Sequence, residues 1–354
     1  MELVKKLTSN PMEKPTDENN LGFGQRFTDH MLLMDHSQDK GWHDARIVPY
    51  GPIEFDLSTM VLHYGQEVFE GMKAYKTVKG ETVLFRPEAN LARLNASNDR
   101  LCIPRIDEKQ ALEHLAELIR IESDWVPKSE GTSLYIRPAI IATDAFLGVK
   151  ASSSYLYFVI LSPSGAYYKN GLQPVRIYVE DELVRAVKGG MGFAKTGGNY
   201  AASILAGERA HEKGYDQVLW LDGVHRRYVE EVGSMNIFFK IGGEIVTPEL
   251  NGSVLPGITR DSVLTLAKDM GYKVSERQIS IDEVFDAHAA GKLEEVFGTG
   301  TAAVISAVSE LTWHERTIVV NDGKMGDFSR LMYDTITGIQ YGTIEDRFGW
   351  IYRV

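Results

Sequence analysis

The sequence predicts a two-domain protein of the α+β or α/β class. Its 354 residues exceed the length at which one hydrophobic core keeps growing, and 44% of them are hydrophobic, which is enough for two cores. Short apolar runs typical of strands are interleaved with segments of helical spacing. Turn residues gather at 162–171 between two strong strand patterns. We therefore expect a small N-terminal domain at 1–163, a linker at 164–174 and a larger C-terminal domain at 175–354.

The N-terminal part begins with strands and then turns to helices. Apolar runs predict the strands 31–34, 57–62, 72–75 and 83–85. A helix is expected at 90–101, and a capping box at 107–110 opens a second helix that extends to about residue 123. Two long β-branched and aromatic runs then predict strands at 133–142 and 155–161.

The C-terminal part alternates the two kinds of element. Strands are predicted at 175–179, 217–222, 236–241 and 244–247. Helices are predicted near 200–213 and at 259–270, with Gly271 closing the second one. A further capping box lies at 280–283, and apolar residues recur with helical spacing over 327–341.

Charge and cysteine content exclude several classes of protein. The formal net charge of −11 disfavours nucleic acids and anionic membranes as partners. A single cysteine, Cys102, excludes an intrachain disulfide framework, and we expect it to be buried. The scattered histidines have no zinc-site spacing, so no metal is expected. Because neither a targeting signal nor a membrane span is visible, we expect a cytoplasmic protein.

One lysine stands in an unusual setting. Lys195 lies within KGGMGFAKTGGNY, residues 188–200, where glycines permit close approach of the backbone to a ligand. A pocket lysine of this kind is a candidate for Schiff-base formation with a bound aldehyde. The alternative from these residues alone is a flexible glycine-rich loop with an exposed lysine.

Downstream motifs match what a pyridoxal phosphate site requires. Thr259, at a predicted helix start, and the hydroxyl of Thr301 suit a phosphate. Either Glu230 or Glu231 could pair with a protonated pyridine nitrogen, and Tyr200 could bind the ring oxygen. Each residue also has a structural alternative: a helix cap, two turn residues and a core side chain.

The motifs together resemble those of branched-chain amino acid aminotransferases, which are fold-type IV pyridoxal-phosphate enzymes with a D-amino acid aminotransferase-like fold. The resemblance covers nearly everything from Phe27. It is carried by the stretches FTDHM at 27–31, LHY at 62–64, FEGMKA at 69–74, SLYIRP at 133–138, the lysine segment, EVGSMN at 231–236, LPG at 255–257 and VFGTGTA at 296–302.

The resemblance implies a cofactor site. Lys195 would be the lysine that binds pyridoxal 5'-phosphate and the base that moves the proton. Arg93 would bind the phosphate with the amides of Ile258 and Thr259 and with Thr301, and Arg185 would lie in the cofactor region. Glu231, rather than Glu230, would face the pyridine nitrogen, and Tyr200 the ring oxygen.

The resemblance also implies a substrate pocket and a homodimer. The residues implied for the pocket are Phe23, Tyr64, Phe69, Tyr135, Arg137, Tyr167, Ser234, Thr301 and Ala302, together with Leu147, Gly148 and Val149 from the other subunit. The implied reaction is a reversible ping-pong transfer of the amino group between L-leucine, L-isoleucine or L-valine and 2-oxoglutarate. Glutamate and the branched 2-oxo acids are then the remaining substrates.

Two alternatives stay open at this point. Fold-type IV also includes D-amino acid aminotransferases and aminodeoxychorismate lyases, and a fold alone does not fix a function. A non-catalytic protein could also bind an anion at the helix that begins near Thr259, with Lys195 acting only through its charge.

Overall fold

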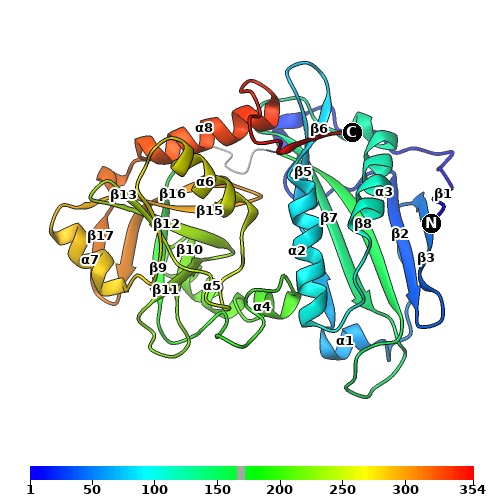
Figure 1. Ribbon diagram of the computed structural model, residues 1–354, viewed down its shortest axis with the longest axis horizontal. Coiled ribbons are helices and arrows are strands. Elements are labelled where there is room, and N and C mark those ends of the chain that lie inside the picture. The colour runs from blue at the N-terminus through cyan, green and yellow to red at the C-terminus, as the bar shows by residue number, and fades with distance from the viewer. Residues whose placement is uncertain (166–171) are drawn as a thin grey trace. The chain divides into compact units, whose positions relative to one another are not determined.

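The computed structural model describes the backbone of residues 1–165 and 172–354, which form two compact units (Figure 1). Unit 1 contains Met1–Tyr167, Ala194–Gly197 and Gly338–Val354, and unit 2 contains Tyr168–Phe193 and Gly198–Thr337. The chain therefore crosses between the units more than once. Within the described ranges, no helix has the length and apolar character that a membrane crossing requires.

Unit 1 is built on a mostly antiparallel sheet. The strand order is β1-β3-β2-β8-β7-β5-β6-β18, and β4 pairs with β7 off this path. The longest pairing joins β7 and β8 in register from Ser133 opposite Ser164 to Ala142 opposite Tyr155. The strands are β1 (Val4–Lys5), β2 (His30–Ser37), β3 (Gly41–Pro49), β4 (Glu67–Phe69), β5 (Met72–Lys76), β6 (Thr82–Phe85), β7 (Ser133–Ala142), β8 (Tyr155–Ser164) and β18 (Ile351–Arg353).

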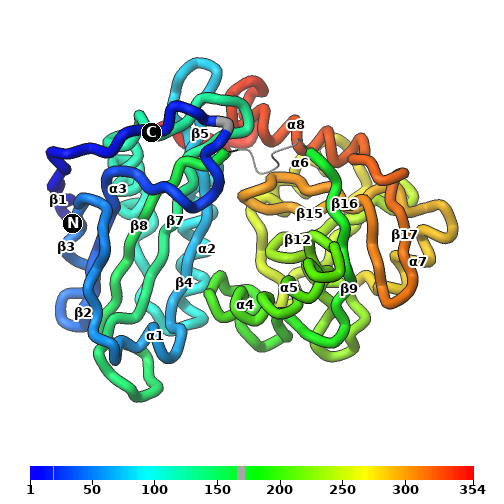
Figure 2. Tube along the Cα trace, turned by 180° about the vertical axis from the view of Figure 1, so that it is seen from behind, coloured from blue at the N-terminus to red at the C-terminus, as the bar shows by residue number. Residues whose placement is uncertain are grey.

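Two helices cover one face of this sheet. Figure 1 shows α2 (Pro87–Arg100) and α3 (Glu108–Ile121) in front of the strands, and Figure 2 shows the strands from behind. Asp107 caps α3 by accepting the Gln110 N–H at 2.9 Å, as the capping box predicts. Leu91 and Leu115, one from each helix, are fully buried in the core of unit 1. Short 3-10 turns lie at Glu18–Asn20 and Ser123–Trp125.

Two expectations for unit 1 were wrong. The predicted strand 57–62 is instead the start of a short helix, α1 (Met60–Tyr64), of which only Met60 is buried. This helix ends at Gly65, whose left-handed backbone (φ 59°) lets its N–H bond to Val61 O. Cys102 is exposed rather than buried, because the turn after α2 places it in a left-handed conformation (φ 56°) at the surface.

Unit 2 contains a sheet that closes on itself. Its strand order is β11-β10-β9-β16-β15-β12-β13-β14, and β17 pairs with β16 off this path. Because β11 also pairs with β12, the strands from β11 to β12 along this path form a closed ring. The strands are β9 (Val175–Glu180), β10 (Gln217–Leu221), β11 (Val229–Val232), β12 (Met235–Ile241), β13 (Glu244–Thr247), β14 (Val274–Glu276), β15 (Leu293–Gly300), β16 (Val304–Trp313) and β17 (Arg316–Val319). Ring closure places the end of β11 directly beside the start of β12.

The helices of unit 2 follow the expected starts and ends closely. Ser280 caps α7 (Ile281–Ala289) by accepting the Glu283 N–H at 3.0 Å. Gly271, with φ 82°, follows Met270, the C-cap residue of α6 (Ile258–Asp269). The single helix expected near 200–213 is two helices, α4 (Gly197–Ala201) and α5 (Ile204–Glu212). A 3-10 turn at Asn321–Gly323 precedes α8 (Asp327–Tyr341).

The two units differ from the continuous domains expected from the sequence. Part of the expected linker, 166–171, lies outside the described residues. The expected C-terminal domain 175–354 includes two segments that belong to unit 1. The first is Gly338–Val354, whose strand β18 pairs with β6 through Ile351 opposite Phe85. The second is Ala194–Gly197, the segment that carries Lys195.

Candidate active site

Lys195 lies among the aromatic residues expected to form a substrate wall. Its Nζ is 4.8 Å from the centroid of the Phe69 ring, and Arg137 Cζ is 4.7 Å from the same centroid. The Arg137 guanidinium donates to Tyr135 Oη at 2.8 Å, and the Tyr135 ring meets Phe23 edge-on at 4.8 Å. Unit 1 therefore brings five of the predicted site residues together around one aromatic group.

Arg93, the predicted phosphate ligand, is held by a carboxylate that sequence reasoning did not assign. Its Nε and Nη2 donate to Glu70 Oε1 and Oε2 at 2.7 and 2.8 Å. Glu70 is fully buried and also accepts Asn90 Nδ2 at 2.8 Å. Burial alone would raise the pKa of Glu70, but the charges of Arg93 and Lys195 lower it below its usual value. Glu70 is therefore ionised at neutral pH, and its two oxygens fix the orientation of the Arg93 guanidinium.

The residues expected to serve a partner subunit lie at the surface of unit 1. Leu147 and Val149 are 63% and 84% exposed, and Gly148 lies between them. Tyr64 Oη donates to Leu147 O at 2.5 Å, so this loop is attached to the end of α1. Leu57 and Leu62, near the same helix, are 85% and 61% exposed, so apolar side chains gather on this side of unit 1.

In unit 2, the buried Glu231 is surrounded by donors. Arg185 Nε is 2.8 Å from Glu231 Oε2, a contact that is an ion pair rather than a well-aligned hydrogen bond. The Leu255 N–H donates to Glu231 Oε1 at 2.9 Å, and Asn236 Nδ2 donates to the same oxygen at 3.3 Å. A buried carboxylate with this many donors is suited to hold a negative charge.

Glu230, the alternative that the residues alone left open, has different surroundings. Adjacent residues of a strand point to opposite faces, so the two carboxylates of β11 diverge. Glu230 accepts from Ser253 Oγ and from Asn251 Nδ2, and burial raises its pKa above the usual value. The two side chains are thus in distinct environments, and the ion pair with arginine belongs to Glu231.

The start of α6 provides main-chain amides for an anion. Gly257 is the N-cap residue and provides no side chain to cap the first turn, which contains Ile258 and Thr259. A Cβ at Gly257 would collide with Asn236 Oδ1, so the backbone can follow this path only with glycine. The N-terminus of this helix therefore has the dipole that favours a phosphate.

The loop between β15 and β16 contains Thr301 and Ala302, both half-buried. Just before it, on β15, the buried Thr299 Oγ1 has no hydrogen-bond partner among the residues that the structure describes. A buried hydroxyl without a protein partner can bind a polar group such as a water molecule or a ligand atom. Thr299 lies in the VFGTGTA motif at 296–302, but no role was predicted for it from the sequence.

The remaining predicted residues are placed as follows. Ser234 is exposed at the turn between β11 and β12, and Tyr200 is half-buried on α4. Tyr167 lies outside the described residues. Lys195, Arg93, Phe23, Tyr64, Phe69, Tyr135, Arg137 and the 147–149 loop belong to unit 1, whereas Arg185, Tyr200, Glu231, Ser234, Ile258, Thr259, Thr301 and Ala302 belong to unit 2.

The donor set fits pyridoxal phosphate. The requirements are an amine for the aldehyde, cationic and amide donors for the phosphate, and an ionised carboxylate for the pyridine nitrogen. In unit 1, Lys195 provides an amine and Arg93 a cation, and in unit 2 the α6 start provides main-chain amides and Glu231 a buried carboxylate.

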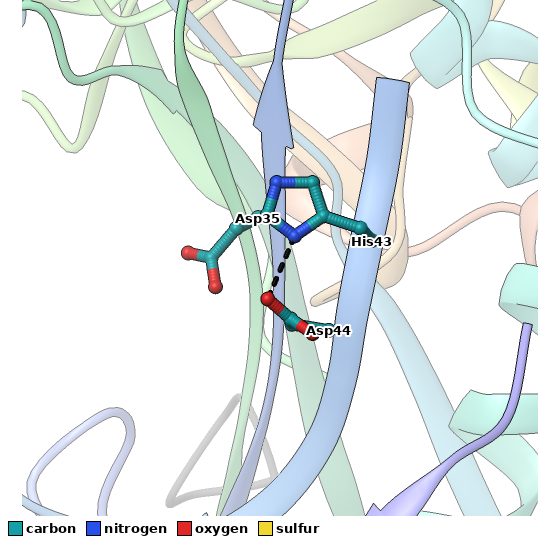
Figure 3. Close-up of side chains that lie close together, drawn as sticks. All are labelled: Asp35, His43 and Asp44. Carbon is teal, nitrogen blue, oxygen red and sulfur yellow. Dashed lines mark hydrogen bonds and ion pairs between the residues drawn. The ribbon is translucent and has the colours of Figure 1, made fainter. Parts of the chain in front are cut away.

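One group of side chains within the described part of the chain has the composition of a metal site. Ligand-type atoms of Asp35, His43 and Asp44 lie within 4.8 Å of one another (Figure 3). However, Arg46 donates to the Asp35 carboxylate, and His43 Nδ1 is 2.8 Å from Asp44 Oδ2. These partners already satisfy the acidic groups, so the cluster carries no functional argument.

Comparisons with known proteins identify the family of this chain. A family model described as amino-transferase class IV matches residues 67–311. Branched-chain-amino-acid aminotransferase 2 of Bacillus subtilis (strain 168) is 61% identical over 348 residues, which cover 98% of this chain and 96% of that protein. The crystal structure of the Escherichia coli branched-chain amino acid aminotransferase gives a TM-score of 0.76 at 28% identity, covering 91% of this chain and 98% of that chain.

A second similar solved structure is a complex with a ligand. It is a branched-chain amino acid aminotransferase of T.th. complexed with N-(5'-phosphopyridoxyl)-L-glutamate, and it gives a TM-score of 0.75 at 29% identity. The match covers 91% of this chain and 97% of that chain.

Proposed function

Because this chain belongs to the class IV aminotransferase family, we propose that it is a branched-chain amino acid aminotransferase. It transfers the amino group reversibly between L-leucine, L-isoleucine or L-valine and 2-oxoglutarate, with pyridoxal 5'-phosphate as cofactor. The observation that carries this proposal is the amine of Lys195 over the Phe69 ring, next to the buried Glu70–Arg93 pair. The identity of 61% to a protein of this name over nearly the whole chain supports it.

Each chemical role falls to a residue of this chain. When bound, the cofactor accepts the amino group and withdraws electrons from the substrate Cα. Lys195 Nζ would hold the cofactor through its aldehyde carbon and would supply the base for the proton at the substrate Cα. Arg93, Ile258, Thr259 and Thr301 would hold the phosphate, and Glu231, which forms an ion pair with Arg185, would face the pyridine nitrogen. Tyr200 binds the ring oxygen.

The aromatic group of unit 1 receives the substrate side chain. Phe69 and Tyr135 present ring faces and edges that suit an aliphatic side chain, and Phe23 extends this wall. Arg137, held by Tyr135, adds a positive charge beside it. Tyr64, Tyr167, Ser234 and Ala302 complete the proposed substrate set.

A homodimer follows from the exposed apolar loop. Leu147, Gly148 and Val149 are proposed to enter the substrate pocket of the partner subunit. The support is the apolar surface formed by these residues with Leu57 and Leu62, which a second copy of the chain would cover.

Borohydride trapping tests the central role. Reduction of the holoenzyme should fix the cofactor on Lys195, as located by mass spectrometry of the digested protein. Lys195→Ala should lose the label and both half-reactions, whereas Lys188→Ala, an exposed lysine of the same segment, should keep them. The buried Lys73, whose pKa burial lowers to about 8, is the competing amine. A label on Lys73, or no label, would refute the assignment.

Two activity measurements test the substrate and the dimer. Turnover of L-leucine with 2-oxoglutarate, and none of D-alanine, is expected, and the opposite preference would favour the D-amino acid aminotransferases. Co-expression of Lys195→Ala with Val149→Asp should restore about a quarter of the wild-type activity, because half of the dimers are mixed and each has one complete site. No restoration in demonstrably mixed dimers would refute the partner contribution.

A further inference from the structure

The main chain of Lys195 is held from both sides. Its carbonyl oxygen accepts the N–H of Phe69 on β4 at 3.0 Å. Its N–H donates to Ser97 Oγ on α2 at 2.9 Å. Ser97 is fully buried, so no water competes for this hydroxyl, and the bond joins residues 98 positions apart in the chain.

The two residues that follow Lys195 are held by a third contact. The carboxylate of Glu67 on β4 accepts the Gly197 N–H, and Thr196 Oγ1 donates to the same oxygen at 3.4 Å. A Cβ at Gly197 would lie 2.5 Å from Glu67 Oε1, so a side chain there would push the carboxylate away. The glycine therefore makes this contact possible.

The three contacts come from two rigid elements. Glu67 and Phe69 are alternate residues of β4, so they point to the same side of the strand. Ser97 lies four residues after Arg93 on α2, so the two side chains are on one face of the helix, one turn apart. A shift of the Lys195 main chain would therefore break a hydrogen bond to β4 or α2 unless that element moved with it.

We propose that Ser97 and Glu67 are positioning residues for Lys195, which fix its main chain so that its amine moves only by side-chain rotation. The inference rests on the proposed function, in which the amine must bond to the cofactor and then, once displaced, reach the substrate Cα proton. Misplacing a reacting group by about 1 Å can reduce a rate by about 100-fold. Neither residue contacts the reacting atoms in this scheme.

The test is a single-turnover half-reaction of the holoenzyme with L-leucine, followed by the absorption of the bound cofactor. It is repeated with leucine deuterated at Cα. Ser97→Ala and Glu67→Ala should slow this step by roughly 10- to 100-fold, with KM changed much less, and should increase the deuterium effect. Glu67→Gln keeps an acceptor oxygen for the Gly197 N–H and should recover most of the rate.

Matched controls separate positioning from stability. Ser280→Ala removes a serine-to-amide bond of 3.0 Å at the start of α7. Glu18→Ala removes a carboxylate that accepts the main-chain N–H groups of Lys128 and Ser129 in unit 1. Both controls lose a hydrogen bond of the same kind without touching Lys195, so their single-turnover rates should match the wild type.

Several results would overturn the inference. It fails if Glu67→Ala and Ser97→Ala retain the wild-type rate, if the loss lies wholly in KM, or if Glu67→Gln is as slow as Glu67→Ala. If Ser97→Ala does not fold, the comparison of Glu67→Ala with Glu67→Gln alone tests the inference. Borohydride labelling of Lys195 in the wild type is scored separately, so failure of the proposed function remains distinguishable.

Discussion

Neutralising Glu70 while leaving Arg93 in place should destabilise unit 1 strongly. The Glu70 side chain is inaccessible to solvent and that of Arg93 is 9% exposed, so Glu70→Gln leaves a guanidinium charge buried without its counter-ion. Removing one partner of a buried ion pair typically costs about 3–5 kcal/mol. Little of this is screened by solvent, because both groups are buried.

A double-mutant cycle isolates the pair itself. Arg93→Met with Glu70→Gln leaves neither charge unpaired, so the double variant should be more stable than the sum of the single changes predicts. Coupling energies within one buried network reach about 3 kcal/mol, and the two-pronged geometry at 2.7 and 2.8 Å places this pair near that value.

The assay is hydrogen exchange of cofactor-free protein, read from peptides of α2. Cofactor-free protein is needed because Arg93 is a proposed phosphate ligand, and ligand binding would add its own stabilisation. Local exchange is preferred to a global unfolding curve, because a chain with two units need not unfold in one step. A coupling energy below about 0.5 kcal/mol would refute the reasoning.

The sign of the pH dependence provides a second check. The folded-state pKa of Glu70 is below its ordinary value of 4.5, so its contribution is present above that value and is lost as the pH falls through the folded pKa. Glu70→Gln should remove this acid-dependent part of the α2 protection. An unchanged acid profile in the variant would contradict the assignment of an ionised Glu70.

Two further predictions concern single charges. Glu231→Ala should retain the cofactor but lose turnover by roughly 100- to 1000-fold, because the pyridine nitrogen loses its counter-charge; kcat at saturating cofactor measures this, and near-normal kcat would disprove the role. Burial lowers the pKa of Lys73 from 10.5 to about 8, because the folded state disfavours its charge. Between pH 8 and 10.5 the folded protein has released this proton while the unfolded chain still holds it, so the free energy of unfolding should rise with pH in this range. Lys73→Met should therefore stabilise unit 1 at pH 7 by roughly 3 kcal/mol and remove this rise, as urea unfolding at several pH values would show.

Local signals in the sequence were sufficient for helix ends. Asp107 and Ser280 cap the helices that their capping boxes predict, because the donor and acceptor are only three residues apart. The prediction of a strand at 57–62 was wrong because four apolar residues in a short run fit both the helical and the strand periodicity. Only the packing around Met60 decides which element forms.

Long-range contacts could not be predicted in this way. The strand β15 has two adjacent acidic residues, Glu294 and Glu295, which made it a poor strand candidate by pattern. In the structure, Glu295 accepts the N–H groups of Phe328 and Ser329 at the start of α8, so a buried charge is satisfied by a helix more than thirty residues away. β18 could not be predicted from local patterns for a similar reason, because its partner strand β6 lies far earlier in the chain.

The candidate site shows the same division. Lys195 stands out by its glycine-rich setting, whereas the residues alone left Glu230 and Glu231 both open and only the family resemblance selected Glu231. The supporting partners do not stand out: Ser97 is 98 positions from Lys195, and Glu70 is 23 positions from Arg93. A sequence read alone shows the chemically active groups, whereas the residues that hold them emerge only when the chain is folded.

The order of segments along the chain has a consequence during synthesis. Unit 1 takes the strand β18 from residues 351–353 and Lys195 from the separate segment Ala194–Gly197. A nascent chain that has reached residue 167 therefore exposes the β6 edge, which is a template for unwanted pairing. The β6 edge is covered only once Ile351–Arg353 has been synthesised, long after the segment that carries Lys195 can bind to β4 and α2.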